Sequence, residues 1–252
     1  MSVPRPFAVL VAGEPIERVR QKRGGYPDII RQAAGEPRAA WLDVDLRDDQ
    51  RALPDPSTVA AVIVTGSSSS VTERAPWMLR AEGYLRDLVR ARVPTFGICF
   101  GHQLLGQALG GHVVKNPCGR EIGTVSFEIV EDDPLLASAE PPFHANATHV
   151  DTIGRLPAGA RVLARTEKEP HAVVRFSETT WGVQFHPEMD RSIVGDYLEV
   201  RAALLSSEGL DARALSERAT DAAAGASTLV RFLEIAVGTA AGDVPNGWRA
   251  SR

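Results

Sequence analysis

Short apolar runs alternate with helix-like stretches through the first half of this 252-residue chain. The apolar runs cover residues 7–12, 39–44, 60–65 and 95–99, and the stretches between and after them include 77–91 and 103–109. Runs of this length between amphipathic stretches are typical of repeated β-α units. We therefore predict an α/β fold with a mostly parallel central sheet flanked by helices.

The pattern changes after Gly111. Strand-like segments follow at residues 124–130, 161–165, 172–176 and 181–185, joined by turns of Pro, Gly and charged residues. We interpret them as a mixed second half of the same domain. From Asp190 to Val237 the chain becomes helical again, and its apolar positions predict packing back onto the sheet. We therefore expect a main domain at residues 1–203 and a C-terminal helical extension and tail at 204–252.

Composition narrows the function classes. The net charge of −4 gives no general attraction to nucleic acid or anionic membrane, which favours a small-molecule substrate. The apolar run at 7–12 is too short for a signal sequence or a membrane span. Two cysteines are too few for a disulfide framework, so we expect a reducing, cytoplasmic location.

Cys99 lies where an apolar strand pattern ends and a helix pattern begins, in the run TFGICFGHQ at residues 95–103. A strand-to-helix turn this sharp brings backbone close to the nucleophile, and side chains at Gly97 and Gly101 would obstruct it. The helix would direct its N-terminal amides and dipole at the sulfur. The pattern predicts a nucleophile elbow with Cys99 at its tip.

The loop GSSSS at residues 66–70 follows another predicted strand, and parallel strands place their ligands beyond their carboxyl ends. One interpretation is a flexible, solvated turn. The other is a loop that offers backbone N–H groups to a developing oxyanion beside the elbow. The sequence of the loop alone leaves both open.

His186 is the histidine whose surroundings best fit a base for Cys99. It follows the strand-like segment 181–185, and Glu188 stands two residues further on, where it could hold one ring nitrogen while the other faces the sulfur. His102 and His149 are expected to pack and support. No pair of histidines has convincing metal spacing, so we expect no metal and no cofactor.

Taken together and in this order, five segments resemble the triad-type glutamine amidotransferase domain, as in the glutaminase module of GMP synthetase. They are VTGSSSSV at 64–71, FGICFGHQ at 96–103, GREIG at 119–123, THVD at 148–151 and GVQFHPE at 182–188. The resemblance implies a flavodoxin-like fold. It also implies hydrolysis of glutamine through a γ-glutamyl thioester, with release of ammonia.

Site roles follow from the resemblance at matching positions. It implies that Cys99 is the nucleophile, that His186 carries the proton and that Glu188 orients His186. Backbone N–H groups of Ser67 and Phe100 would form the oxyanion hole, although the GMP-synthetase branch usually has glycine at the position of Ser67. Contacts to the substrate are implied for a further set of residues, namely Gly66, Gln103 and Gly123.

Other functions remain open at this stage. The elbow also fits a cysteine hydrolase of the α/β-hydrolase type with Asp151 as its acid, or a γ-glutamyl peptidase with the same triad, or a binding module without catalysis. The residues after Glu188 read as helices, and the chain has no phosphate-binding Gly-x-x-x-x-Gly-Lys loop. We therefore expect a separate ammonia-accepting synthetase as partner. The cations of 18–23 would form a solvated loop, or else contact such a partner or a substrate carboxylate.

Overall fold

The computed structural model describes residues 5–35 and 40–239. Within them the strands are β1 (Phe7–Val11), β2 (Trp41–Asp45), β3 (Ala61–Val64), β4 (Thr95–Ile98), β5 (His112–Lys115), β6 (Glu121–Ile129), β7 (Phe143–His149), β8 (Asp151–Arg155), β9 (Arg161–Arg165), β10 (Val173–Ser177) and β11 (Thr180–Val183). The helices are α1 (Glu17–Arg23), α2 (Tyr26–Ala34), α3 (Pro76–Arg90), α4 (Phe100–Ala108), α5 (Arg191–Val200), α6 (Ala202–Ser207), α7 (Ala212–Glu217) and α8 (Ala223–Thr239).

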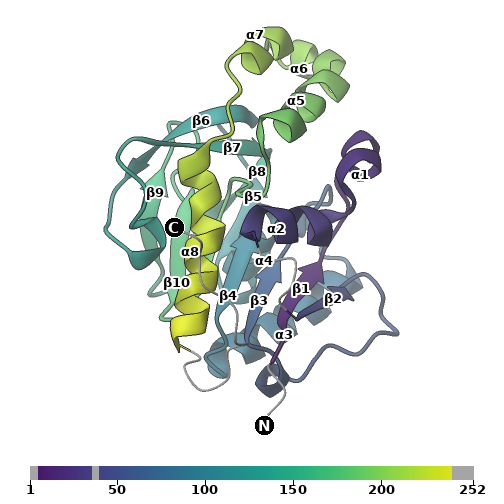
Figure 1. Ribbon diagram of the computed structural model, residues 1–252, viewed down its shortest axis with the longest axis vertical. Helices are drawn as coiled ribbons and strands as arrows, with labels where there is room; N and C mark the ends of the chain where they lie inside the picture. Colours follow the sequence, from purple (N-terminus) through teal and green to yellow (C-terminus); the bar gives the residue numbers. More distant parts are fainter. Residues whose placement is uncertain (1–4, 36–39, 240–252) are drawn as a thin grey trace.

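Nine of the described strands form one sheet in the order β2-β1-β3-β4-β11-β10-β9-β6-β7 (Figure 1). The five strands from β2 to β11 are parallel, and the four from β10 to β7 continue the sheet in antiparallel pairing. The predicted α/β class with a largely parallel sheet is confirmed. The predicted mixed second half corresponds to the antiparallel strands.

Helices cover both faces of the sheet. Alternate residues of β1 show this, because Val9 packs in the cluster that includes Ile30 of α2 and Phe232 of α8, while Leu10 packs in the cluster that includes Leu85 of α3. A parallel strand buried on both faces has no polar side to display. This is why the run at 7–12 is apolar without alternation.

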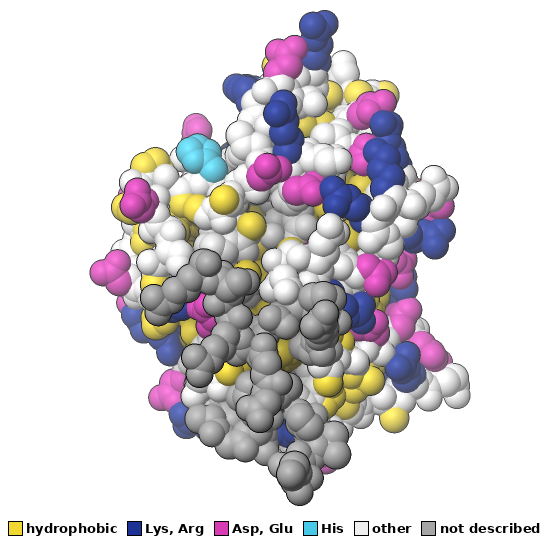
Figure 2. Space-filling view, in the orientation of Figure 1, with side chains coloured by type: hydrophobic (Ala, Val, Ile, Leu, Met, Phe, Trp, Pro, Cys, Tyr) yellow, Lys and Arg dark blue, Asp and Glu magenta, His cyan; other side chains and the backbone are white. Residues whose placement is uncertain are grey.

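A small helical lobe, formed by α5, α6 and α7, projects beyond the sheet next to α1 (Figure 1). Lys and Arg side chains gather over α1 in Figure 2. Lys22 binds Asp196 at 2.8 Å and Arg23 binds Asp190 at 2.7 Å, so both join α1 to α5 or its N-cap. The expectation of a solvated loop at 18–23 is therefore wrong: the segment is a helix tied to the lobe.

Three strands, β5, β7 and β8, did not stand out in the sequence. β7 reads FHANATH, with few large apolar residues, yet most of it is buried, because α8 packs against it while it pairs with β6. The expected boundary at 203/204 falls inside α6. The expected tail lies mostly outside the described residues. Among the described helices, none is long and apolar enough to cross a membrane.

Candidate active site

Three adjacent parallel strands, β3, β4 and β11, end at the same edge of the sheet and place the candidate catalytic segments there. Cys99 follows β4, and its backbone N–H donates to the Val183 carbonyl at the end of β11 at 2.8 Å. Gly66 follows shortly after β3. The carboxyl ends of parallel strands thus bring together chain segments that are far apart in sequence.

Cys99 adopts the backbone conformation of a nucleophile elbow. Its φ of 50° and ψ of −100° are strained for a residue with a side chain, a state that costs on the order of 1–3 kcal/mol. A β-carbon at Gly97 would lie 2.6 Å from the Gly101 carbonyl carbon, and one at Gly101 would overlap the Val64 carbonyl oxygen. The turn requires glycine at both positions, as the sequence pattern indicates.

His186 lies between Cys99 and Glu188. Its Nδ1 is 2.7 Å from Glu188 Oε1, and both side chains are buried. Burial disfavours the charged imidazole, but the Glu188 carboxylate, which is hydrogen-bonded to the ring, and the nearby Cys99 sulfur together raise the pKa of His186 well above its usual value. The arrangement stabilises a proton on this imidazole.

The ring of His186 is held in place from several sides. Tyr26 stacks beside it, with ring centroids 6.4 Å apart and an interplanar angle of 15°. The backbone N–H of His186 donates to the Asn146 carbonyl at 2.8 Å. Gly66 packs closely against the ring, and a β-carbon at this position would lie 2.8 Å from Cε1 of His186. Gly66 therefore leaves room for the imidazole.

The loop after β3 accommodates serine at position 67. Ser67 is not among the non-glycine residues with positive φ, so its side chain adds no strain, and its Oγ accepts a hydrogen bond from the Ser69 N–H at 3.1 Å. Gly13, in the loop after β1, makes space for it, since a β-carbon there would lie 2.7 Å from Ser67 Oγ. The role of Gly13 was not evident from the sequence.

Two backbone N–H groups of the site, one next to Cys99 and one in the cavity wall, remain available. Phe100 is the first residue of α4, and Ser67 lines the cavity beside His186. Among the described residues, neither backbone N–H donates a hydrogen bond. Their free donors fit the expected oxyanion hole, which needs donors aimed at developing charge.

Gln103 lies away from open solvent. Its Nε2 donates to the Asp151 carbonyl and to Gln184 Oε1, each at 3.0 Å, and Gln184 Nε2 donates to Cys99 Sγ at 3.5 Å. Both amide hydrogens of Gln103 are thus used by the protein, so its expected contact with substrate is left to its Oε1. Gln184 is a contact of the sulfur that sequence reasoning missed, although it lies within the GVQFHPE segment.

Asp151 is turned away from His186. Its carboxylate accepts a hydrogen bond from Ser70, and its backbone carbonyl accepts one from Gln103. His149 is buried between Glu121 and the Asp151 carbonyl, at 3.2 Å and 3.1 Å. The acid beside His186 is therefore Glu188, and the hydrolase-type pairing of His186 with Asp151 has no support in the geometry.

The remaining candidates lie apart from the sulfur. Gly123, in β6, has a φ of 105° and approaches Leu215 of α7 rather than the cavity. His102 is fully buried against Phe176, and burial lowers its pKa to about 3. A neutral, packed imidazole at this position fits the supporting role expected for it.

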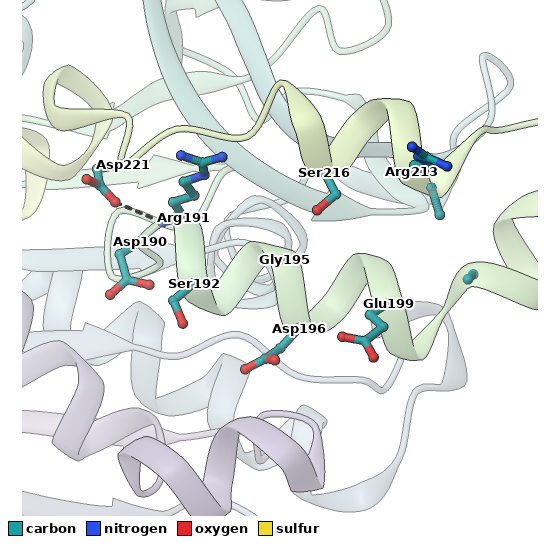
Figure 3. Close-up of a pocket in the computed structure, with 11 residues that line it drawn as sticks. Asp190, Arg191, Ser192, Gly195, Asp196, Glu199, Arg213, Ser216 and Asp221 are labelled. Carbon is teal, nitrogen blue, oxygen red and sulfur yellow. Dashed lines mark hydrogen bonds between the residues drawn. The ribbon is translucent and has the colours of Figure 1, made fainter.

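A cavity of about 360 Å³ opens beside His186. Its walls come from the loops after β1 and β3, from β7 and from the end of α5; they include Gly13, Glu14, Tyr26, Arg47, Ser67, Thr148, His186, Tyr197 and Arg201. This volume suits a ligand the size of an amino acid or small peptide. A larger hollow of about 750 Å³ lies between α5 and α7 and contains neither Cys99 nor His186 (Figure 3).

The sequence matches one family model over most of its folded part. The model, described as glutamine amidotransferase class-I, covers residues 32–199. Among curated proteins, the glutamine-hydrolyzing GMP synthase of Thermosipho africanus is 37% identical over 183 residues, which is 72% of this chain and 31% of that protein. A glutamine-hydrolyzing GMP synthase subunit from Sulfolobus acidocaldarius is 36% identical over 138 residues, 54% of this chain and 70% of its own length.

Solved structures share the fold over nearly the whole chain. A glutamine amidotransferase from Thermotoga maritima has a TM-score of 0.73 at 20% identity and covers 92% of this chain and 98% of its own. One from Methylobacillus flagellatus has a TM-score of 0.73 at 20% identity and covers 100% of this chain and 99% of its own. At this identity the likeness shows the fold alone. The shared fold includes the helices that follow β11.

Proposed function

This chain belongs to the class-I glutamine amidotransferase family, and we propose that it hydrolyses the side-chain amide of glutamine through a γ-glutamyl thioester on Cys99. The observation that carries the proposal is the position of His186, which is hydrogen-bonded to Glu188 through Nδ1 at 2.7 Å and is near enough to the Cys99 sulfur to interact with it electrostatically. A base held between a nucleophile and an orienting carboxylate is the arrangement that nucleophilic acyl transfer needs.

In the first half-reaction the sulfur of Cys99 attacks the side-chain amide carbon of glutamine. His186 holds the proton taken from the thiol and then delivers it to the nitrogen as the C–N bond breaks, so that ammonia leaves and the γ-glutamyl thioester remains. The raised pKa of His186 favours the protonated imidazole that this delivery requires. Glu188 keeps the ring oriented through Nδ1.

The negative charge that develops on the amide oxygen would be bound by the backbone N–H groups of Ser67 and Phe100. One such donor contributes on the order of 3 kcal/mol of transition-state stabilisation. The N-terminal end of α4 adds a favourable dipole at the same place.

In the second half-reaction water replaces ammonia. His186 accepts a proton from water as its oxygen attacks the thioester carbon, and the proton returns to sulfur when the C–S bond breaks. Glutamate leaves, and the Cys99 thiol is regenerated.

Gln103 is given a positioning role. We propose that its side-chain amide positions Gln184, whose own amide in turn contacts the Cys99 sulfur.

The ammonia would serve a separate acceptor enzyme. This chain spans 31% of the first GMP synthase that it matches, whereas it spans 70% of a protein named as a subunit of GMP synthase. The relative named as a subunit of GMP synthase supports the proposal that the ammonia is passed to a synthetase. The synthetase, rather than this chain, would determine which molecule receives the ammonia.

The test is release of ammonia and glutamate from glutamine, measured in parallel with γ-glutamyl peptides and with the C99A variant. We expect product from glutamine with the wild-type protein and none above background with C99A. A glutamine-mimicking electrophile should add to Cys99, as detected by mass spectrometry, even where turnover is slow without a partner. Turnover of γ-glutamyl peptides alone would identify a peptidase; no product and no adduct would refute the proposal.

A further inference from the structure

One arginine in the wall of the cavity beside His186 forms no ion pair among the described residues. Arg201 follows α5 and lies half-buried in the cavity wall, where its Nη1 donates to Thr148 Oγ1 at 2.6 Å. Its guanidinium stacks over the Tyr197 ring at 4.9 Å from the centroid. Within the described part of the chain, no Asp or Glu lies within ion-pair distance of Arg201.

The second arginine in the wall of the cavity already has carboxylate partners. Arg47 pairs with Asp45 at 2.7 Å and with Glu14 at 3.3 Å, so its charge is already balanced. Near Arg201, the guanidinium of Arg120 is paired with Glu208. Burial, and to a smaller extent Arg120, lowers the pKa of Arg201. A partly buried guanidinium that forms no ion pair of its own is stabilised when an anion from outside supplies the partner.

Thr148 links Arg201 to the nucleophile. Its hydroxyl accepts a hydrogen bond from Arg201, and its backbone carbonyl lies 4.0 Å from Cys99 Sγ. The Cys99 sulfur also acts electrostatically on Arg201. One residue of β7 therefore contacts both the nucleophile and the arginine.

The wall that carries Arg201 is rigid. Tyr197 accepts a hydrogen bond from the Ile16 N–H at 3.3 Å and contacts the Tyr26 hydroxyl at 3.3 Å. Asp196, on the same helix, binds Lys22 and Arg18 of α1, each at 2.8 Å. An arginine on such a support can present its planar fork to a carboxylate with little loss of entropy.

We propose that Arg201 binds the α-carboxylate of the γ-glutamyl substrate and selects carboxylate-bearing substrates over neutral ones. The inference rests on the proposed function and assigns the amino-acid end of the substrate to the end of α5. It replaces the contact expected from Gly123, which lies away from this cavity.

The test separates binding from hydrolysis by using the C99A chain. Calorimetry would compare L-glutamine with L-glutaminamide, in which a neutral amide replaces the α-carboxylate. Adding R201M should weaken glutamine binding by about 10- to 100-fold and change glutaminamide binding by less than about 3-fold. R201K should lie between the two, and R213M, at an exposed arginine of α7, should leave both ligands unchanged.

Glutaminamide binding also reports whether each variant is folded, and circular dichroism checks R201M independently. Equal loss for both ligands, no change in glutamine binding, or no binding of glutamine to the C99A chain would each overturn the assignment of Arg201. Failure of the proposed function has another signature, since the wild-type chain would then release no ammonia while the binding preference could still be measured.

Discussion

Gly66 and His186 are in direct contact across the edge of the sheet, with no space between them for a methyl group. A β-carbon at Gly66 would lie 2.8 Å from Cε1 of the imidazole, inside van der Waals contact. The ring is enclosed on its other sides by Tyr26 and by its bond to Glu188. The His186 ring can therefore take this position only because residue 66 has no side chain.

The first prediction concerns this contact. G66A should leave the protein folded, since Gly66 does not have positive φ, but it should displace His186 and lower kcat for glutamine by about 10- to 100-fold. The matched control is G195A in α5, where nothing lies within 4 Å of the added carbon. G195A should raise the free energy of unfolding by about 0.5–1 kcal/mol and leave kcat unchanged. Equal kcat for G66A and the wild type would contradict the prediction.

A second prediction separates the two candidate acids. E188Q should lower kcat by about 10²- to 10⁴-fold, because the amide no longer stabilises the imidazolium or fixes the ring tautomer. D151N should stay within about 10-fold of the wild type, since the Asp151 carboxylate contacts Ser70 instead of His186. Steady-state ammonia release measures both variants. A collapse with D151N alone would assign the acid to Asp151.

A third prediction follows from the strain at Cys99. C99A and C99G should both abolish turnover, but C99G should be the more stable variant by about 1 kcal/mol, because glycine adopts positive φ without a steric penalty. Denaturant unfolding of the three proteins measures the difference. Should C99G be no more stable than C99A, the turn would not store strain at this residue.

The fourth prediction uses the raised pKa of His186. A group whose pKa is higher in the folded than in the unfolded state contributes stability that is complete below its unfolded pKa, about 6.5, and is lost as the pH rises through the folded value. The excess stability of the wild type over H186Q should therefore shrink as the pH rises above about 6.5. Chemical denaturation over a series of pH values on both sides of this point checks the sign, and an excess that grows with pH would refute it.

Local sequence patterns were sufficient for the elements that form the parallel sheet. β1 and β3 are buried on both faces and read as uninterrupted apolar runs, and the glycines at 97 and 101 mark a turn that only glycine permits. β9 coincides with its predicted range at 161–165. For β1, β3 and the turn, the local residues alone determine the structure, either because they are apolar on both faces of a strand or because only glycine fits the turn.

Contacts between distant segments could not be found in this way. Gln184 and Gln103 become partners only because β11 lies beside β4, and Thr148 meets Arg201 because α5 turns back over β7. The sequence of α1 resembles a charged loop because its exposed face is rich in cations, whereas its helical form depends on ion pairs with α5. Such features arise from the packing of the chain as a whole.

The pairing of β4 with β11 has a consequence for how the protein matures. β11 is synthesised long after β4, yet it is inserted between β4 and β10, and contacts so distant in sequence form slowly. Until that insertion, Cys99 lacks both the Val183 carbonyl and the His186 imidazole. A chain in which β11 has not yet joined the sheet therefore lacks the imidazole beside Cys99, and labelling of Cys99 by a substrate-like electrophile would report when β11 has been inserted.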